Sequence, residues 1–222
     1  RPASAQAPYV RVQPPPPPSA EEIQRAKEIY RVILGSPSFN SAQDTLGTGQ
    51  YAVARRSFED GDFDSAAARF QRFANRFPRN LLVNEALEHV LLIRENRETR
   101  APGDEPLKIY ARAVSLHEAG LADSAAAVAR SGLERFPAAR IRHHWRYLLA
   151  GIARDQGDHL TAISFALAVA DTTSRSRLAP YALQLAGDET IAMGDDPAKA
   201  LRLYQALLER YPTSPLAPPV RA

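Results

Sequence analysis

The chain has 222 residues, of which 45% are hydrophobic and 24% charged, a balance that is typical of a folded globular protein. The absence of cysteine excludes disulfides, thiolate metal sites and cysteine nucleophiles. The formal net charge of +3 is too small for bulk electrostatics to predict a nucleic-acid or membrane partner. No run of apolar residues approaches the roughly 18 that a membrane-spanning helix needs.

Residues 1–19 form a proline-rich arm that cannot build a core. Its consecutive prolines favour polyproline II, because each ring fixes φ and removes a backbone donor. Such a segment is a stiff spacer or a ligand for an aromatic groove, and we expect it to dock to a partner through Pro14, Pro15, Pro16, Pro17 and Pro18. The small residues that alternate at positions 3–7 are typical of the end of a secretory signal, with a plain Ala/Pro-rich tail as the alternative.

A helical pattern begins after the arm. Ser19 is a suitable N-cap, acids follow it, and apolar residues from Ile23 to Ile33 recur at helical spacing. Gly35 and Pro37 end this first helix, and residues 35–49 are expected to be a loop or a weak helix start. No convincing strand alternation follows, so we expect about ten helices and no sheet.

One spacing recurs four times along the rest of the chain: a small residue, a glycine seven positions later, and an alanine five positions after that. The copies are Ala54, Gly61 and Ala66; Ala113, Gly120 and Ala125; Ala150, Gly157 and Ala162; and, with one extra residue, Gly187, Gly194 and Ala200. The small residue lets two helices approach, the glycine ends the first helix with a left-handed φ, and the alanine packs opposite the small residue. Three copies end in an aromatic residue and a proline, at Pro78, Pro137 and Pro212, where the second helix stops.

This pattern resembles the tetratricopeptide-repeat (TPR) family, whose units are antiparallel helix pairs of about 34 residues. The resemblance covers roughly residues 45–212 and is strongest to the divergent repeats of bacterial periplasmic and outer-membrane proteins. It implies an all-α, TPR-like solenoid of about four helix pairs, with an extended proline-rich N-terminal arm. It also implies a non-enzymatic protein–protein interaction scaffold, or an accessory subunit of a bacterial cell-envelope complex, in the periplasm or envelope; the cytoplasm is the alternative.

The register departs from the family after the first copy. Gly120 lies 59 residues after Gly61, and the extra length holds an additional helix at 81–98 and a break at 101–106. We therefore expect four segments: the arm at 1–19; an N-terminal helix, the first repeat and the extra helix at 20–100; three further repeats at 101–214; and a proline-rich tail at 215–222.

The resemblance also indicates where a partner would bind, because the first helix of each TPR pair lines a concave groove. The residue three positions before the small residue is Tyr51, Tyr110 and Tyr147 in the first three copies, and Gln184 in the fourth. The tyrosines would form a ladder that binds a peptide, or they would pack between repeats. The same alignment adds Arg55, Phe58, His117 and Arg154 as groove candidates, and His144 is a further one.

A basic stretch at 130–154 suggests a second kind of partner. Arg135, Arg140, Arg142 and Arg146 lie near Trp145 and Tyr147, so an acidic peptide, lipid head groups or RNA stacked on the aromatic rings could bind there. A solvated helical face is the simpler interpretation, and nucleic acid is disfavoured.

No motif predicts catalysis, a cofactor or a small-molecule substrate. His143 and His144 are neighbours that diverge by about 100° in a helix, so we expect no metal site there. The expected partners are other proteins, as subunits of a larger complex, with any membrane contact made only through them. A purely structural subunit of a large assembly or filament is the remaining alternative.

Overall fold

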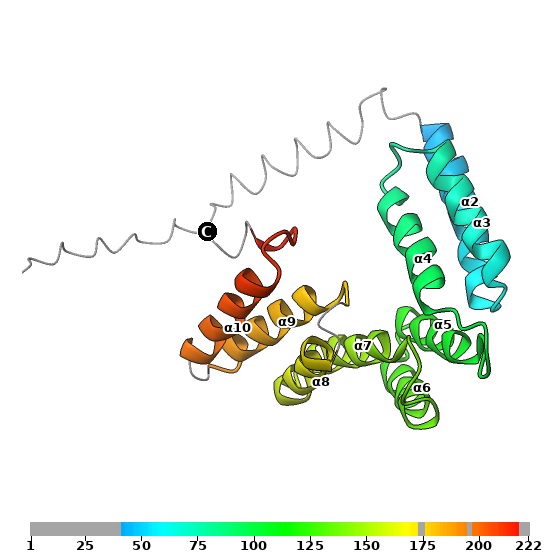
Figure 1. The fold of residues 1–222 in the computed structure, drawn as a ribbon. Coiled ribbons are helices and arrows are strands. Elements are labelled where there is room, and N and C mark those ends of the chain that lie inside the picture. Colours follow the sequence, from blue (N-terminus) through cyan, green and yellow to red (C-terminus); the bar gives the residue numbers. More distant parts are fainter. Residues whose placement is uncertain (1–40, 173–175, 195–196, 218–222) are drawn as a thin grey trace, which may run out of the picture. The chain divides into compact units, whose positions relative to one another are not determined.

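The computed structural model of the chain describes residues 41–172, 176–194 and 197–217. Within these ranges the structure contains nine helices and no strand, which confirms the all-α prediction (Figure 1). The helices are α2 (Ser41–Glu59), α3 (Phe63–Arg76), α4 (Val83–Asn96), α5 (Glu105–Glu118), α6 (Ala122–Arg135), α7 (Arg142–Asp155), α8 (His159–Thr172), α9 (Ala179–Ala192) and α10 (Pro197–Arg210). The predicted arm and the helix after Ser19 lie outside the described residues. Among the helices that are described, none combines the length and apolarity that a membrane crossing requires.

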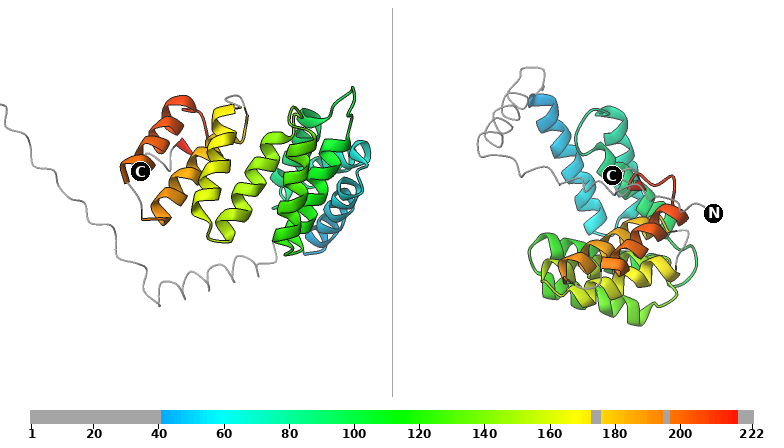
Figure 2. Two further views of the ribbon diagram at one scale, coloured as in Figure 1. Left: turned by 90° about the horizontal axis from the view of Figure 1, so that it is seen from below. Right: turned by 90° about the vertical axis from the view of Figure 1, so that its left-hand side faces the viewer.

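The packing described below is that of one compact unit, Gly47–Ala222. Its helices pair as α2 with α3, α5 with α6, α7 with α8, and α9 with α10, and from α5 to α10 each helix packs against the next (Figure 2). The expected four pairs are therefore present in the described chain. The additional helix is α4, which packs against α3 and is close to the predicted range.

Steric demands explain why the repeat spacing produces helix pairs. The small residues and alanines of the first three copies are wholly buried at the helix contacts; they are Ala54, Ala66, Ala113, Ala125, Ala150 and Ala162. A larger side chain at any of them would force the paired helices apart. Gly61 and Gly120 end the first helices of their pairs with φ of 78° and 77°, a left-handed conformation that other residues rarely adopt.

Three of the four second helices, α3, α6 and α10, end in a three-residue motif of arginine, aromatic residue and proline. In each case the guanidinium lies over the ring of the following residue, at 5.1 to 5.6 Å from the ring centroid. The stacked pairs are Arg76 with Phe77, Arg135 with Phe136, and Arg210 with Tyr211. The sequence interpretation used the aromatic residue and the proline of this motif and missed the arginine, which covers the ring at the helix end.

Of the two alternatives for residues 35–49, a loop or a weak helix start, the described residues follow the second. Helix α2 starts at Ser41, so Gly47 and Gly49 lie inside a helix. The structure gives a reason for the first glycine, because a Cβ at Gly47 would stand 2.9 Å from the side-chain nitrogen of Asn80. This glycine lets α2 approach the turn that follows α3, a packing role that outweighs its low helix propensity.

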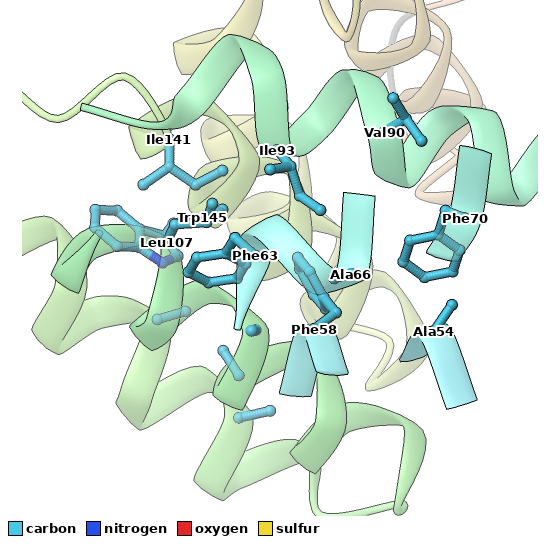
Figure 3. Close-up of a cluster of buried hydrophobic side chains, with 14 of the residues drawn as sticks. Ala54, Phe58, Phe63, Ala66, Phe70, Val90, Ile93, Leu107, Ile141 and Trp145 are labelled. Carbon is cyan, nitrogen blue, oxygen red and sulfur yellow. The ribbon is translucent and has the colours of Figure 1, made fainter. Parts of the chain in front are cut away.

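The largest core cluster joins α2 through α7 and includes the unpaired helix (Figure 3). Phe63 and Phe70 of α3 are at most 1% exposed, and Ile93 of α4 is buried beside them. Each large side chain buried in this way contributes about 1.5–3 kcal/mol relative to leaving it in water. Helix α4 is thus held by the same core as the repeats around it. A smaller cluster joins α8, α9 and α10 and includes Leu216, beyond the last helix.

Candidate functional site

A hollow of about 920 Å³ lies where α7, α9 and the end of α10 face α4. We call it the tyrosine pocket and define it by six of its lining residues: Glu88, Tyr147, Arg177, Tyr181, Arg210 and Tyr211. The residues come from segments far apart in the sequence, because the connection between α8 and α9 reaches α4. The rest of the lining includes apolar side chains such as Leu178 and Pro180.

Both arginines of the tyrosine pocket are engaged with the protein. The Arg177 guanidinium donates to the Glu88 carboxylate at 2.7 Å and lies 3.6 Å from that of Glu95. Arg210 donates to the Ala170 carbonyl at 3.0 Å and stacks on Tyr211. Their charges are therefore largely balanced or directed to protein groups before any ligand arrives.

Two tyrosines that line the pocket, Tyr147 and Tyr181, offer ring surface and hydroxyl groups to a ligand. Tyr181 is 37% exposed, more than is usual for the aromatic rings of the described residues. Tyr147 is half-buried against α8 and α9, and burial raises the pKa of its hydroxyl, so it stays protonated and able to donate at neutral pH. Neither the Tyr147 nor the Tyr181 hydroxyl has a hydrogen-bond partner within the described ranges.

Only one member of the predicted tyrosine ladder lines this pocket. Tyr51 is 6% exposed and packs between Phe70, Phe73 and His89, with its hydroxyl donating to Glu85. Burial is the main cause of its raised pKa, and the Glu85 carboxylate adds to it. This tyrosine follows the alternative in which the ladder packs between helices.

Tyr110 is half-buried and also packs within the chain. Its ring meets that of His144 edge-on at 5.5 Å, and burial raises the pKa of its hydroxyl. It belongs to the core cluster that α4 completes, whereas Tyr147 is exposed to the pocket.

The other predicted groove residues lie at several separate places. Arg55 pairs with Glu118 of α5 and with Glu59, and Phe58 is 2% exposed in the core. His117 lies 4.0 Å from Asp155, and Arg154 pairs with the same carboxylate at 2.9 Å. None of these side chains, nor that of His144, lines the tyrosine pocket.

The histidine pair lies at the junction of α7 with α4. The ring centroids of His143 and His144 are 4.4 Å apart, so the two rings meet although the residues are neighbours on α7. The amide nitrogen of Asn96 lies 3.4 Å from Nε2 of His144. The pKa of His143 is lowered to about 4 and that of His144 to about 3, mainly by burial and also by nearby positive charges. In the parts of the chain that are described, no three His, Cys, Asp or Glu side chains gather as metal ligands.

The basic stretch is partly tied to backbone and acidic groups. The contacts are Arg135 to Glu105 at 3.7 Å, Arg142 to the Ala139 carbonyl at 3.1 Å and Arg146 to the Ala168 carbonyl at 3.5 Å, while the Arg140 amide donates to Glu98. Trp145 is wholly buried, so the suggestion that a nucleic-acid base stacks on this ring is wrong. The predicted docking prolines at 14–18 lie outside the described residues.

Sequence alignment of the repeats missed most of the tyrosine pocket. It selected Gln184 in the fourth repeat, whereas Tyr181, one turn earlier on α9, faces the pocket. Tyr211 carried a signal, since it belongs to the arginine–aromatic–proline motif. Arg177 carried none, because it lies in a connection outside the repeated spacing.

The helix pairs of the described residues are those of a helical-repeat protein. Residues 181–214 match the family described as tetratricopeptide repeat, and no curated protein matches the chain. The matched range covers most of α9, α10 and the following turn, and the three earlier pairs share its spacing, which supports the resemblance of the chain to the tetratricopeptide-repeat family. Such repeats typically mediate protein partner binding and are generally non-enzymatic.

Proposed function

We propose that this protein is a non-enzymatic interaction scaffold that holds a segment of a partner protein in the tyrosine pocket. The observation that carries the proposal is the pairing of a TPR fold with a hollow of about 920 Å³ whose tyrosine hydroxyls at 147 and 181 have no partner in the described chain. An exposed ring in a pocket binds a polypeptide with little loss of side-chain freedom.

The proposed setting is a bacterial cell-envelope complex in which the chain is an accessory subunit. The resemblance to divergent envelope repeats and the small residues at 3–7 support this setting. The proline-rich termini are proposed as further docking segments. A structural subunit without a pocket ligand would contact several neighbours and leave the tyrosine pocket empty.

The test is affinity purification of the tagged full chain from its native source, with chemical crosslinking and identification of the captured chains. The variant Tyr147→Ala/Tyr181→Ala should lose its main crosslinked partner. The matched control is Leu160→Ala, which removes an apolar side chain that is 67% exposed on α8 and does not line the pocket. Unchanged capture by the tyrosine variant, with an unchanged unfolding temperature, would overturn the proposal.

The same preparation tests the docking segment at 1–19. Its deletion should reduce partner retention while the helical circular dichroism signal stays the same. If both are unchanged, the arm has no docking role.

A further inference from the structure

The tyrosine pocket offers a ligand flat rings, apolar walls and hydroxyl donors. Tyr147 comes from α7, Tyr181 from α9 and Tyr211 from just after α10, so rings from three separate segments of the sequence line the hollow. Pro180 and Leu178 add apolar surface between them. A volume of about 920 Å³ has room for several residues, as pockets of roughly 300–1,000 Å³ hold drug-sized ligands.

Charge recognition is a weak point of this pocket. An anionic group could bind Arg177 only in competition with Glu88 and Glu95, which already flank the guanidinium. Arg210 is held by a backbone carbonyl and by the face of Tyr211. A phosphate or carboxylate ligand would have to displace these contacts, and this cost disfavours an anion as the occupant.

The backbone hydrogen bonds of a bound segment distinguish a strand, a helix and a polyproline II segment as possible occupants of the pocket. A strand would need an unpaired sheet edge, and the described parts of the chain contain no strand. A helix has satisfied its own carbonyls and gains little from hydroxyl donors. A polyproline II segment has no internal hydrogen bonds, so its carbonyls are free to accept from the hydroxyls of Tyr147 and Tyr181.

Proline rings also suit the walls of the hollow. In polyproline II three residues make one turn with a rise of about 3.1 Å per residue, so the rings form apolar ridges that fit between aromatic side chains. The segment is already extended before it binds, which reduces the entropy lost on association.

We propose that the tyrosine pocket binds a proline-rich segment of a partner protein in the polyproline II conformation. The proposal rests on the proposed scaffold function and specifies the kind of segment that the pocket accepts. Tyr181 and Tyr147 contact the proline rings and donate to carbonyls of the segment, and Arg177 stays with its glutamates.

The test is a fluorescence-anisotropy titration of the full chain with a labelled peptide of eight consecutive prolines. A glycine/serine peptide and a helix-forming Ala/Glu/Lys peptide of the same length are the controls. Because the chain itself carries prolines at 14–18, the titration is repeated on a variant in which these five are serine, which removes competition from that source.

The proline peptide should bind, and the two control peptides should bind at least about tenfold more weakly. Tyr181→Phe should weaken binding about fivefold, as expected for one neutral hydrogen bond, and Tyr181→Ala about tenfold or more. Raising the salt from 50 to 500 mM should change the dissociation constant less than about twofold, because no ion pair forms. Far-UV circular dichroism checks that each variant is folded.

Equal binding of the three peptides, or no effect of the Tyr181 substitutions, would overturn the proposal. Binding that falls steeply with salt would also overturn it, in favour of an anionic ligand. A partner captured from the native source that depends on Tyr147 and Tyr181 but is not displaced by the proline peptide would overturn this proposal and leave the scaffold function standing. If capture does not depend on the two tyrosines, the scaffold function itself fails.

Discussion

The indole ring of Trp145 in α7 lies directly against the backbone of Gly132 in α6. A Cβ added to Gly132 would stand 2.7 Å from two carbons of that ring and 3.1 Å from Ile109. Trp145 is wholly buried, so the ring has no space into which it could move. This contact lets the second repeat pair approach the third more closely than an alanine would allow.

The first prediction is that Gly132→Ala lowers the free energy of unfolding by about 1–3 kcal/mol, the usual cost of overpacking a core. Gly151→Ala in α7 is the matched control, because its Cβ would meet nothing within 4 Å. That substitution should stabilise the protein by about 0.5–1 kcal/mol through helix propensity alone. Urea unfolding curves measure both, and equal effects of the two substitutions would contradict the packing role of Gly132.

A related contact within the fourth repeat should respond less strongly. A Cβ at Gly187 would stand 2.7 Å from the ring of Tyr204, but this ring is partly exposed and donates to Asp188 at 2.6 Å. Since Tyr204 can swing outward and lose only one surface hydrogen bond, Gly187→Ala should cost less than Gly132→Ala, about 1 kcal/mol. The same unfolding experiment ranks the two, and a larger cost at Gly187 would show that Tyr204 is fixed in place.

The pH dependence of stability should reflect the histidines at the junction of α4 and α7. Burial lowers the pKa of His144 to about 3 and that of His143 to about 4, whereas a histidine in the unfolded chain titrates near 6.5. The unfolded chain therefore binds protons first, and the stability contributed by the neutral histidines is present above about pH 6.5 and is lost as pH falls toward 4.

The third prediction is a slope of about 1.4 kcal/mol per pH unit for each of these histidines between pH 6 and 4.5. His144→Gln should lower the slope of the unfolding free energy against pH by the contribution of one histidine. Between pH 7 and 8 the free energy of unfolding of this variant should not depend on pH. Denaturant unfolding at half-unit pH intervals gives both values. An unchanged slope in the variant would show that His144 is not buried as a neutral group.

The sequence predicted the helix pairs because each position in the repeated spacing has a local steric reason. Ala54 and Ala66 mark the helix surfaces that touch, and Gly61 marks where the chain turns. These roles do not depend on residues far away in the sequence. The repeated spacing does not predict the position of α4 or the residues that line the tyrosine pocket. They depend on contacts such as Arg177 with Glu88, 89 residues apart, which single-sequence spacing does not encode.

The residues just after the last helix should contribute to stability. Leu216 packs against the cluster formed by Ala170, Leu183 and Leu207, and Ala217 is 1% exposed. Truncation after residue 214 exposes this surface and should lower the free energy of unfolding by about 1–3 kcal/mol. Truncation after residue 217 keeps these contacts and is the control. The unfolding midpoints of the two truncated chains should differ clearly, and equal midpoints would mean that the packing contributes nothing.

The ion pair between Arg177 and Glu88 should fix the connection before α9 against α4. Both side chains are about half exposed, at 46% and 66%, so either single charge reversal, Arg177→Glu or Glu88→Arg, should cost less than about 1 kcal/mol of global stability. Hydrogen exchange near residues 176–178 should nevertheless speed up in each single variant, because like charges then face each other across the contact. The double variant should restore slow exchange in part, because the glutamate at position 177 still faces Glu95.

The control for this pair is the local one between Arg56 in the last turn of α2 and Asp60 just after the helix, at 3.4 Å. Reversing its charges should leave exchange at 176–178 unchanged. Salt at 1 M should reduce the difference in exchange rate between the single and the double variants of Arg177 and Glu88, because the screening length falls to about 3 Å. If the double variant exchanges as fast as the single ones, the charges do not hold the connection, and apolar contacts of Leu178 must position it instead.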